Sequence, residues 1–380
     1  MPFMDTGVYI AEAIESIRSQ TVPAFEVVCV DDGSRDNSRA IVEDFVARDP
    51  RIRLLDAPRA SRGPGAARNH ALRMAAADHV AFLDSDDLLR PDFTESLMAR
   101  SREFDADVVM CCIEQFGADA TSYVSKQCSY DKYIPSGLDG QVFDVAELGD
   151  DALNLRFVAW NKLYRRQWLL DSGLEFAEDA FYEDLSFTFG VLLAAQRIVF
   201  VRQPLVMNRK LRSGATTFGR SDRTLDLVGA LDHLDALQGE GAPWSEEAIA
   251  ALRFRKLCSH LPKVEPQELE PYYDQVREAA ARVVDLDAHS QLSKNFRAHL
   301  DAVVGQNLVG YLSWALWRAE HRLDRAQAAR RAALASLEDA GRPEPAVTGS
   351  DGPRAASILS RLLRRVRRQV VRVWRRARRS

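Results

Sequence analysis

The residues with the clearest chemical potential are carboxylates that follow a short apolar segment. Residues 79–83 are mostly apolar, and the run Asp84-Ser85-Asp86-Asp87 comes directly after them. Three carboxylates within four residues concentrate negative charge, which a bound cation would offset. Mg²⁺ or Mn²⁺ prefers such oxygen ligands together with substrate phosphate. The pattern indicates a metal and diphosphate site, and a solvated turn that caps the next helix is the alternative.

Two further acidic pairs are candidates for chemistry. Asp31 and Asp32 follow the apolar residues 26–30, and the glycine after them permits a tight turn. They are candidates for ligand contacts, or for caps of the helix that follows. Glu183 and Asp184 begin a segment with helical spacing and come after two aromatic residues. They are dipole partners of that helix, or they include a general base whose basicity is raised by limited water.

The surrounding pattern predicts the elements that position these groups. Short apolar segments alternate with amphipathic ones, which is typical of an α/β sheet covered by helices on both faces. We expect strands at 26–30, 51–56, 79–83 and 108–111, and helices at 8–19, 38–47 and 66–76. Ligands of such sheets bind outside the carboxyl ends of the strands. The acidic pairs at 31–32 and 84–87 should therefore face one crevice.

Five motifs in order carry a resemblance to a known family. The segments VDDGSRDNS, GPGAARNHAL, HVAFLDSDDLLRPD, AWNKLYRRQWL and FYEDLSFTF resemble those of family-2 glycosyltransferases with the GT-A fold. The resemblance covers about residues 2–215. It implies a Rossmann-like, mostly parallel sheet with helices on both faces, and an inverting transfer of a sugar from a nucleotide-diphosphate donor.

The resemblance also implies roles for residues on the donor side. Asp31 and Asp32 match positions at the nucleotide base, and Arg68 and Asn69 match a segment that lines the donor pocket. The D-x-D pair that binds metal is matched by Asp84 and Asp86, with Asp86 the more direct ligand and Asp84 nearer the ribose and sugar.

On the acceptor side, Asp184 matches the catalytic base of the family's acidic pair, and Glu183, the other member of that pair, is the second catalytic candidate. Lys162 lies in a segment that the resemblance places beside the donor sugar and acceptor. Arg209 and Arg212 resemble basic residues on a loop that closes over the diphosphate, although their spacing departs from the usual pattern.

The N-terminus departs from the family pattern. Family members begin with an apolar strand, and Met1–Asp5 starts at the very end of it. The missing strand would leave unpaired backbone groups on both neighbours. We hypothesise that the natural start lies upstream or that the chain is a truncated and impaired form.

The rest of the chain is predicted to form further parts. We expect the GT-A domain at 1–220, a helical accessory domain at 221–340, a Gly- and Pro-rich linker at 341–353 and a basic amphipathic tail at 354–380. The tail has eleven arginines and no acid, whereas the remainder has 40 basic and 55 acidic side chains. An apolar stripe flanked by arginines is typical of a helix on an anionic membrane surface. Attraction to nucleic acid and a solvated end are the alternatives, and we expect no nucleic-acid partner.

Composition limits the class of protein. The chain has 380 residues, 46% of them hydrophobic, and no apolar run long enough to span a membrane. Five scattered cysteines without a C-x-x-C pair favour reduced thiols. We therefore expect a cytoplasmic enzyme, peripheral at the inner face of the membrane.

The functional prediction is an inverting, metal-dependent glycosyltransferase. We expect it to move a sugar, most simply from a UDP-sugar, to a glycan or lipid-linked acceptor of a cell wall, capsule or exopolysaccharide. The alternative is a catalytically impaired subunit that binds sugar nucleotide or polymer. A nucleotidyltransferase with the same carboxylate pair is disfavoured by Glu183 and Asp184.

Overall fold

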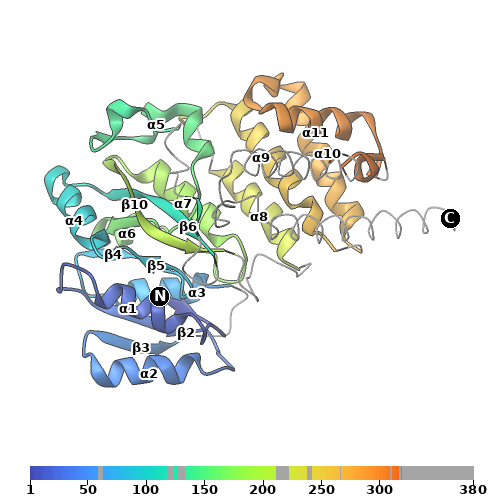
Figure 1. The fold of residues 1–380 in the computed structure, drawn as a ribbon. Helices are drawn as coiled ribbons and strands as arrows, with labels where there is room; N and C mark the ends of the chain where they lie inside the picture. The colour runs from blue at the N-terminus through green and yellow to red at the C-terminus, as the bar shows by residue number, and fades with distance from the viewer. Residues whose placement is uncertain are drawn as a thin grey trace, which may run out of the picture. The chain divides into compact units, whose positions relative to one another are not determined.

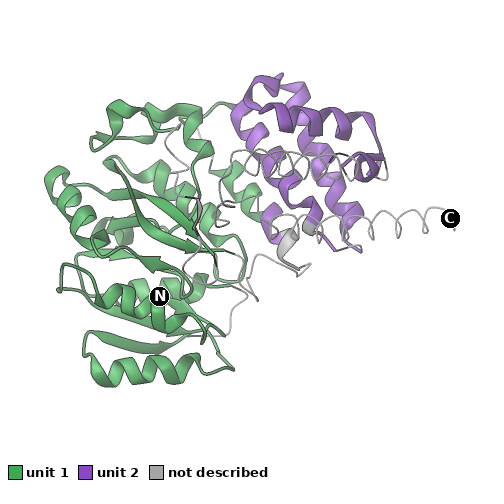
Figure 2. Ribbon diagram, viewed as in Figure 1, with its two compact units in different colours: residues 1–121, 125–213, 229–245 green, residues 122–124, 214–228, 246–380 purple. Residues whose placement is uncertain are grey.

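The structure is a computed structural model. It describes residues 1–58, 63–117, 123–125, 133–210, 222–237, 242–265, 267–308, 310–315 and 318. Contacts divide the chain into two compact units: unit 1 holds residues 1–121, 125–213 and 229–245, and unit 2 holds 122–124, 214–228 and 246–380 (Figure 2). The expected linker at 341–353 and tail at 354–380 lie outside the described residues. The expected domain boundaries stay predictions.

Unit 1 begins with a three-stranded parallel sheet in the order β1-β2-β3 (Figure 1). Its strands are β1 (Pro2–Phe3), β2 (Val27–Asp31) and β3 (Ile52–Asp56). Along β2, Val27 and Cys29 join one apolar cluster, and Val28 and Val30 join another. This alternation follows the two-residue period of a strand, so both faces of β2 are buried, as the continuous apolar run predicts.

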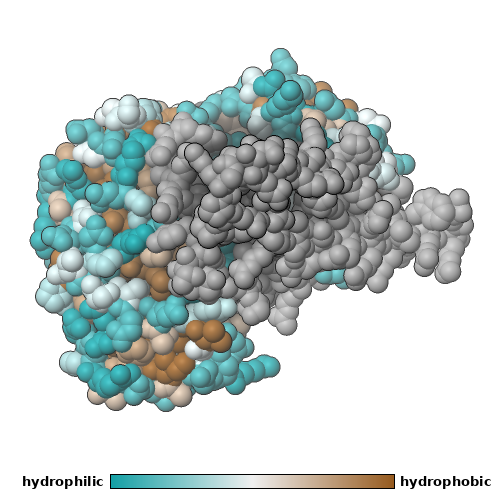
Figure 3. Space-filling model, viewed as in Figure 1, coloured by the Kyte–Doolittle hydropathy of each residue, from teal (hydrophilic) through white to brown (hydrophobic). Residues whose placement is uncertain are grey.

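Helices cover both faces of this sheet. The cluster with Val27 contains side chains of α1 (Ile10–Arg18) and α2 (Ser38–Arg48), and the cluster with Val28 contains those of α3 (Gly65–Met74). The visible described surface of unit 1 is mostly hydrophilic, with apolar residues grouped over the three-stranded sheet (Figure 3). The helices and strands that the sequence predicted over residues 8–76 are present in the structure.

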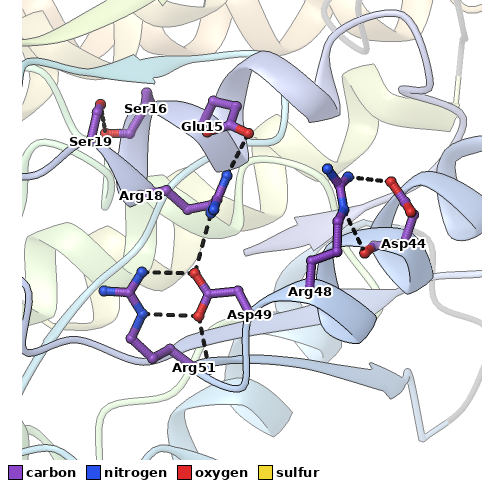
Figure 4. A network of polar contacts seen from close by, with 8 residues as sticks. All are labelled: Glu15, Ser16, Arg18, Ser19, Asp44, Arg48, Asp49 and Arg51. Atoms are coloured by element: carbon purple, nitrogen blue, oxygen red, sulfur yellow. Dashed lines mark hydrogen bonds and ion pairs between the residues drawn. The ribbon is translucent and has the colours of Figure 1, made fainter.

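Polar contacts join α1, α2 and β3 at one end of the sheet (Figure 4). Asp49, at the end of α2, accepts hydrogen bonds from Arg51 at 2.7 and 2.9 Å and from Arg18 at 3.2 Å. Arg18 also donates to Glu15 at 2.7 Å. The hydrogen bonds from Arg51, followed by those from Arg18, hold the pKa of Asp49 well below its usual range although burial opposes them.

The first strand is short but paired. Met1 O accepts from Val30 N and Phe3 O accepts from Asp32 N, both at 2.9 Å. The Met1 ammonium group is buried and donates to Val28 O at 2.8 Å, and burial lowers its pKa. Within the described residues, β1 pairs with β2 alone, so the sheet is divided in two at this strand. The hypothesis of an upstream start stays a prediction.

The described residues of the second sheet form seven strands, with a central order β4-β9-β6-β10-β5. Pairing of β6 with β10 is parallel, whereas β4 with β9, β9 with β6 and β10 with β5 are antiparallel. The strands are β4 (His79–Ala81), β5 (Leu88–Leu89), β6 (Val108–Phe116), β7 (Tyr123–Ser125), β8 (Val142–Phe143), β9 (Lys162–Arg165) and β10 (Ile198–Arg209). Helices of this part are α4 (Phe93–Phe104), α5 (Val145–Leu148), α6 (Arg166–Asp171) and α7 (Glu183–Ala194).

Unit 2 is helical in its described residues from 246 onward. It contains α9 (Glu246–His260), α10 (Leu269–Asp285) and α11 (Lys294–Gly305), and α8 (Asp222–Ala236) runs through the sequence boundary of the two units. Tyr311 is buried, and its hydroxyl lies 2.7 Å from His299 Nδ1. In the described residues, no helix is long and apolar enough to cross a membrane. The α/β fold with a following helical region is confirmed.

Candidate functional site

Arg68 is the centre of a buried cluster of charges in unit 1. Its guanidinium group donates to Asp84 Oδ1 at 2.6 Å, to Asp184 Oδ1 at 2.9 Å and to Glu183 Oε1. The Arg68 side chain is 2% exposed, that of Glu183 is 7% exposed, and those of Asp84 and Asp184 are 33% and 20% exposed. The arginine thus lies beneath the carboxylates, and two of them face outward.

Close backbone approach brings α3 to the segment that precedes α7. A Cβ atom on Gly65 would lie 2.1 Å from Ala177 O, and one on Gly63 would lie 2.6 Å from Ala180 O. Because a real Cβ cannot approach so closely, only glycine fits at these two positions. This contact explains why glycines precede Arg68 by a few residues in the sequence.

Asn69 fixes the same approach by hydrogen bonds. Its Nδ2 donates to Phe176 O and its Oδ1 accepts from Phe176 N, both at 2.9 Å, and Nδ2 also donates to Glu178 at 3.2 Å. Asn69 is 1% exposed. The structure therefore places Asn69 as a clamp on this segment, and its expected contact with the donor stays a prediction.

Tyr182 begins α7 with a left-handed backbone at φ +67°. Such a conformation is costly for a bulky residue, by about 1–2 kcal/mol. It turns the chain immediately before Glu183 and Asp184, so that both carboxylates stand in the first turn of the helix. The helix N-terminus favours negative charge at these positions.

Burial raises the pKa values of both carboxyl groups. The pKa of Glu183 rises to about 7, because burial and the charge of Asp184 outweigh the opposing effect of Arg68. Burial also raises the pKa of Asp184, and Arg68 opposes it. A carboxylate whose pKa is raised accepts a proton more readily, which suits a general base.

Lys162, the first residue of β9, is the second buried cation near Asp184. Its Nζ donates to Val158 O at 2.6 Å and to Asn161 Oδ1 at 2.8 Å. Burial lowers the pKa of Lys162 to about 7, although the charge of Asp184 opposes this. Because the ammonium group contacts backbone and amide oxygens, its expected contact with donor sugar or acceptor stays a prediction.

The acidic turn that follows β4 is held from the second sheet. Asp87 is fully buried and accepts from Asn208 Nδ2 at 2.9 and 3.0 Å and from Arg209 N at 2.8 Å. Asp92 precedes α4 without a side-chain capping bond. The alternative of a solvated turn with a helix cap thus does not describe Asp87.

The donor set of this turn is compatible with a divalent cation. Asp84 and Asp86 supply carboxylate oxygens, which are the ligands that Mg²⁺ and Mn²⁺ prefer. In the described residues, no group of three or more His, Cys, Asp or Glu side chains is arranged to hold a metal. A metal at this turn would therefore need further ligands from a bound diphosphate.

Asp31 and Asp32 lie at the carboxyl end of β2. Asp31 is buried, accepts from Ser34 N at 2.9 Å and pairs with Arg39 of α2 at 3.1 Å. The first backbone N–H of α2, that of Ser38, donates to Asp36 at 2.9 Å. The structure thus uses Asp31 for a turn and an ion pair and leaves Asp32 half-buried, and their expected contacts with the nucleotide base stay predictions.

Arg209 lies in a strand and not in the loop that the resemblance implied, and its expected contact with the diphosphate stays a prediction. Arg209 is the last residue of β10 and is 4% exposed, because two apolar runs around Pro204 form one bulged strand beside β6. Arg212 lies outside the described residues. Sequence reasoning also missed Asn208, which donates to Asp87 of the acidic turn, and Glu12, which accepts from Arg209. The apolar runs at 198–201 and 205–207 were the signal that could have located this strand.

Comparisons with known proteins agree with this architecture. The family described as Glycosyl transferase family 2 matches residues 1–169. Putative glycosyltransferase EpsH of Bacillus subtilis (strain 168) is 30% identical over 211 residues, covering 53% of this chain and 57% of that protein. Chondroitin synthase of Escherichia coli is 34% identical over 113 residues, covering 30% of this chain and 16% of that protein. This chain therefore spans less than two thirds of these relatives.

Solved structures share the fold. The crystal structure of S. aureus TarS 1-349 in complex with UDP-GlcNAc has a TM-score of 0.61 and 21% identity, and the match covers 82% of this chain and 87% of that one. At this level of identity the likeness concerns the fold. The charge cluster, the sheet and the comparisons agree: residues 1–169 match the model of glycosyl transferase family 2, and the chain has a GT-A-like fold.

Proposed function

We propose that this protein is an inverting glycosyltransferase that transfers a sugar from a nucleotide-diphosphate donor to an acceptor hydroxyl. The observation that carries the proposal is the Arg68 cluster, which brings Asp84 and Asp184 together from positions 100 residues apart. The family match and the similarity to glycosyltransferases support the reaction class. The UDP-GlcNAc complex of TarS supports a UDP-sugar as the first donor to test.

In this proposal Asp184 is the general base. It removes the proton from the acceptor hydroxyl, whose oxygen attacks the anomeric carbon as the bond to the diphosphate breaks. The electron pair of that bond leaves on the diphosphate. A divalent cation held by Asp84 and Asp86 would supply positive charge to the leaving oxygens.

Arg68 and Glu183 support the base. Arg68 holds Asp184 in place and favours its ionised form, against the effect of burial. Glu183, whose pKa is about 7, shares the same cation and does not face outward. The Asp184 side chain is 20% exposed, so an acceptor can reach it. A bound acceptor would then place a hydroxyl against a base of raised pKa.

The acceptor side of the proposal comes from the relatives and the C-terminal sequence. One relative is named chondroitin synthase, after a polysaccharide, so we propose a polysaccharide or a lipid-linked glycan as acceptor. We also propose that residues 354–380 bind an anionic membrane surface through eleven arginines. Co-sedimentation with anionic liposomes tests this, and equal binding by a chain without these residues would contradict it.

Asp184→Asn tests the base. The variant should lose transfer and Mn²⁺-dependent donor hydrolysis while keeping donor binding, which is measured as a thermal shift with a panel of UDP-sugars. The control is Asp171→Asn, an exposed carboxylate on α6 that accepts from Gln167 at 2.8 Å. Normal turnover by Asp184→Asn would refute the assignment. A wild-type chain that binds donors without turning them over would favour the alternative of an impaired binding subunit.

A further inference from the structure

Arg209 is enclosed beneath the acidic turn. Its side chain is 1% exposed. The guanidinium carbon lies 4.6 Å from the ring centroid of Phe116 and 4.9 Å from that of Tyr9. A planar cation near two aromatic faces is held in one orientation. The charge of Arg209 is therefore fixed inside unit 1 and is not presented on a surface.

The hydrogen bonds of Arg209 lead to two successive residues of the turn. Its Nε donates to Asp86 O at 2.9 Å, and its backbone N donates to Asp87 Oδ1 at 2.8 Å. The far end of the guanidinium, Nη2, donates to Glu12 Oε2 of α1 at 2.6 Å. One residue thus connects the turn to the end of β10 and to the first helix.

These contacts restrict the backbone of Asp86. A held carbonyl restricts the peptide plane that follows Asp86, and with it the direction of the Cα–Cβ bond from which the Asp86 carboxylate extends. Partners that orient a metal ligand from behind affect metal affinity without touching the metal. A contact between Arg209 and a diphosphate would require this buried side chain to become accessible.

We propose that Arg209 is a positioning residue, which holds Asp86 in the orientation that binds the metal of the donor complex. This inference rests on the proposed function, because it takes Asp86 as a metal ligand. It replaces the direct diphosphate contact that the sequence resemblance implied for Arg209. Arg209 acts through Asp86, so its loss should affect metal-dependent binding and leave metal-free nucleotide binding unchanged.

Nucleotide affinity measured by calorimetry tests the proposal, with UDP as the probe and with or without Mn²⁺. Arg209→Met should keep the metal-free UDP affinity of the wild type. The factor by which Mn²⁺ increases that affinity should be about 10–100-fold smaller in the variant. The control is Arg202→Met, an arginine on the same strand that pairs with Asp139 at 3.4 Å. A parallel loss of metal-free affinity, or an unchanged gain from Mn²⁺, would overturn the proposal.

Hydrogen exchange decides the positioning role separately from the reaction. The Asp87 amide donates to Asp84 O at 3.0 Å, so its exchange reports the integrity of the turn. Arg209→Met should speed this exchange at least about tenfold relative to Arg202→Met, because the turn loses a backing contact. Unchanged exchange would overturn the positioning role.

Absence of metal-dependent UDP binding in the wild type would instead count against the proposed function. If Arg209→Met does not fold, Arg209→Lys gives the same comparison, since an ammonium lacks the forked geometry.

Discussion

Replacing Arg68 by methionine would remove the cation that three carboxylates share. Glu183 would then be buried, and Asp184 partly buried beside it, without a counter-ion at 2.9 Å or less. Breaking a buried ion pair in this way costs about 3–5 kcal/mol of the free energy of unfolding. We expect that loss at pH 8, where both carboxyl groups of the unfolded chain are ionised.

The loss should depend on pH in a defined direction. Glu183 has a pKa of about 7 in the folded wild type, above its value in the unfolded chain, so its contribution to stability falls as pH rises toward 7. Without Arg68 its pKa rises further, and stability keeps falling above pH 7 by up to about 1.4 kcal/mol per pH unit. The difference between wild type and variant should therefore be smallest near pH 5.5 and largest at pH 8 to 9.

Urea denaturation at several pH values measures this difference. The control is Arg73→Met on the same helix, because Arg73 is 47% exposed and pairs with Glu175 at 2.6 Å. Its loss should cost about 1 kcal/mol or less. A destabilisation by Arg68→Met that is as small as the control, or that is equal at pH 5.5 and pH 8, would refute the electrostatic role of Arg68. In the second case its packing against Phe176, at 5.3 Å, would account for the loss.

Two further predictions concern groups near the same cluster. Lys162 has a pKa of about 7 in the folded chain, below its unfolded value, so the unfolded chain binds more protons between pH 7 and about 10 and stability should rise with pH. In Lys162→Met that rise should be weaker in urea titrations, and an unchanged slope would contradict the pKa shift. Gly65→Ala puts a Cβ 2.1 Å from Ala177 O and should cost about 1–3 kcal/mol and reduce donor turnover. Gly137→Ala, where a Cβ meets nothing within 4 Å, should change stability by no more than about 0.5 kcal/mol, and equal effects of the two changes would refute the close approach.

The sequence alone predicted the elements whose pattern is local. The continuous apolar run of β2 required burial on both faces, and the acidic turn after β4 was placed at a strand end. The same pattern, with five ordered motifs, was sufficient for the family whose model matches residues 1–169 and for the fold class. Strand β10 was missed because Pro204 and its polar neighbours interrupt the apolar run, and parallel pairing with β6 is a long-range contact that no local signal shows.

The tertiary structure decided which of the predicted residues act together. Arg68 and Asp184 are 116 positions apart in the chain, and only the contact between α3 and the segment before α7 brings them to 2.9 Å. The same is true of Arg209. The sequence around it resembled a loop that closes over the diphosphate, whereas its side chain is buried and donates to Asp86. Residue types and spacing determine which groups can carry charge or bind a metal. Burial and partners, which arise from packing of distant segments, determine their pKa values and the direction in which they point.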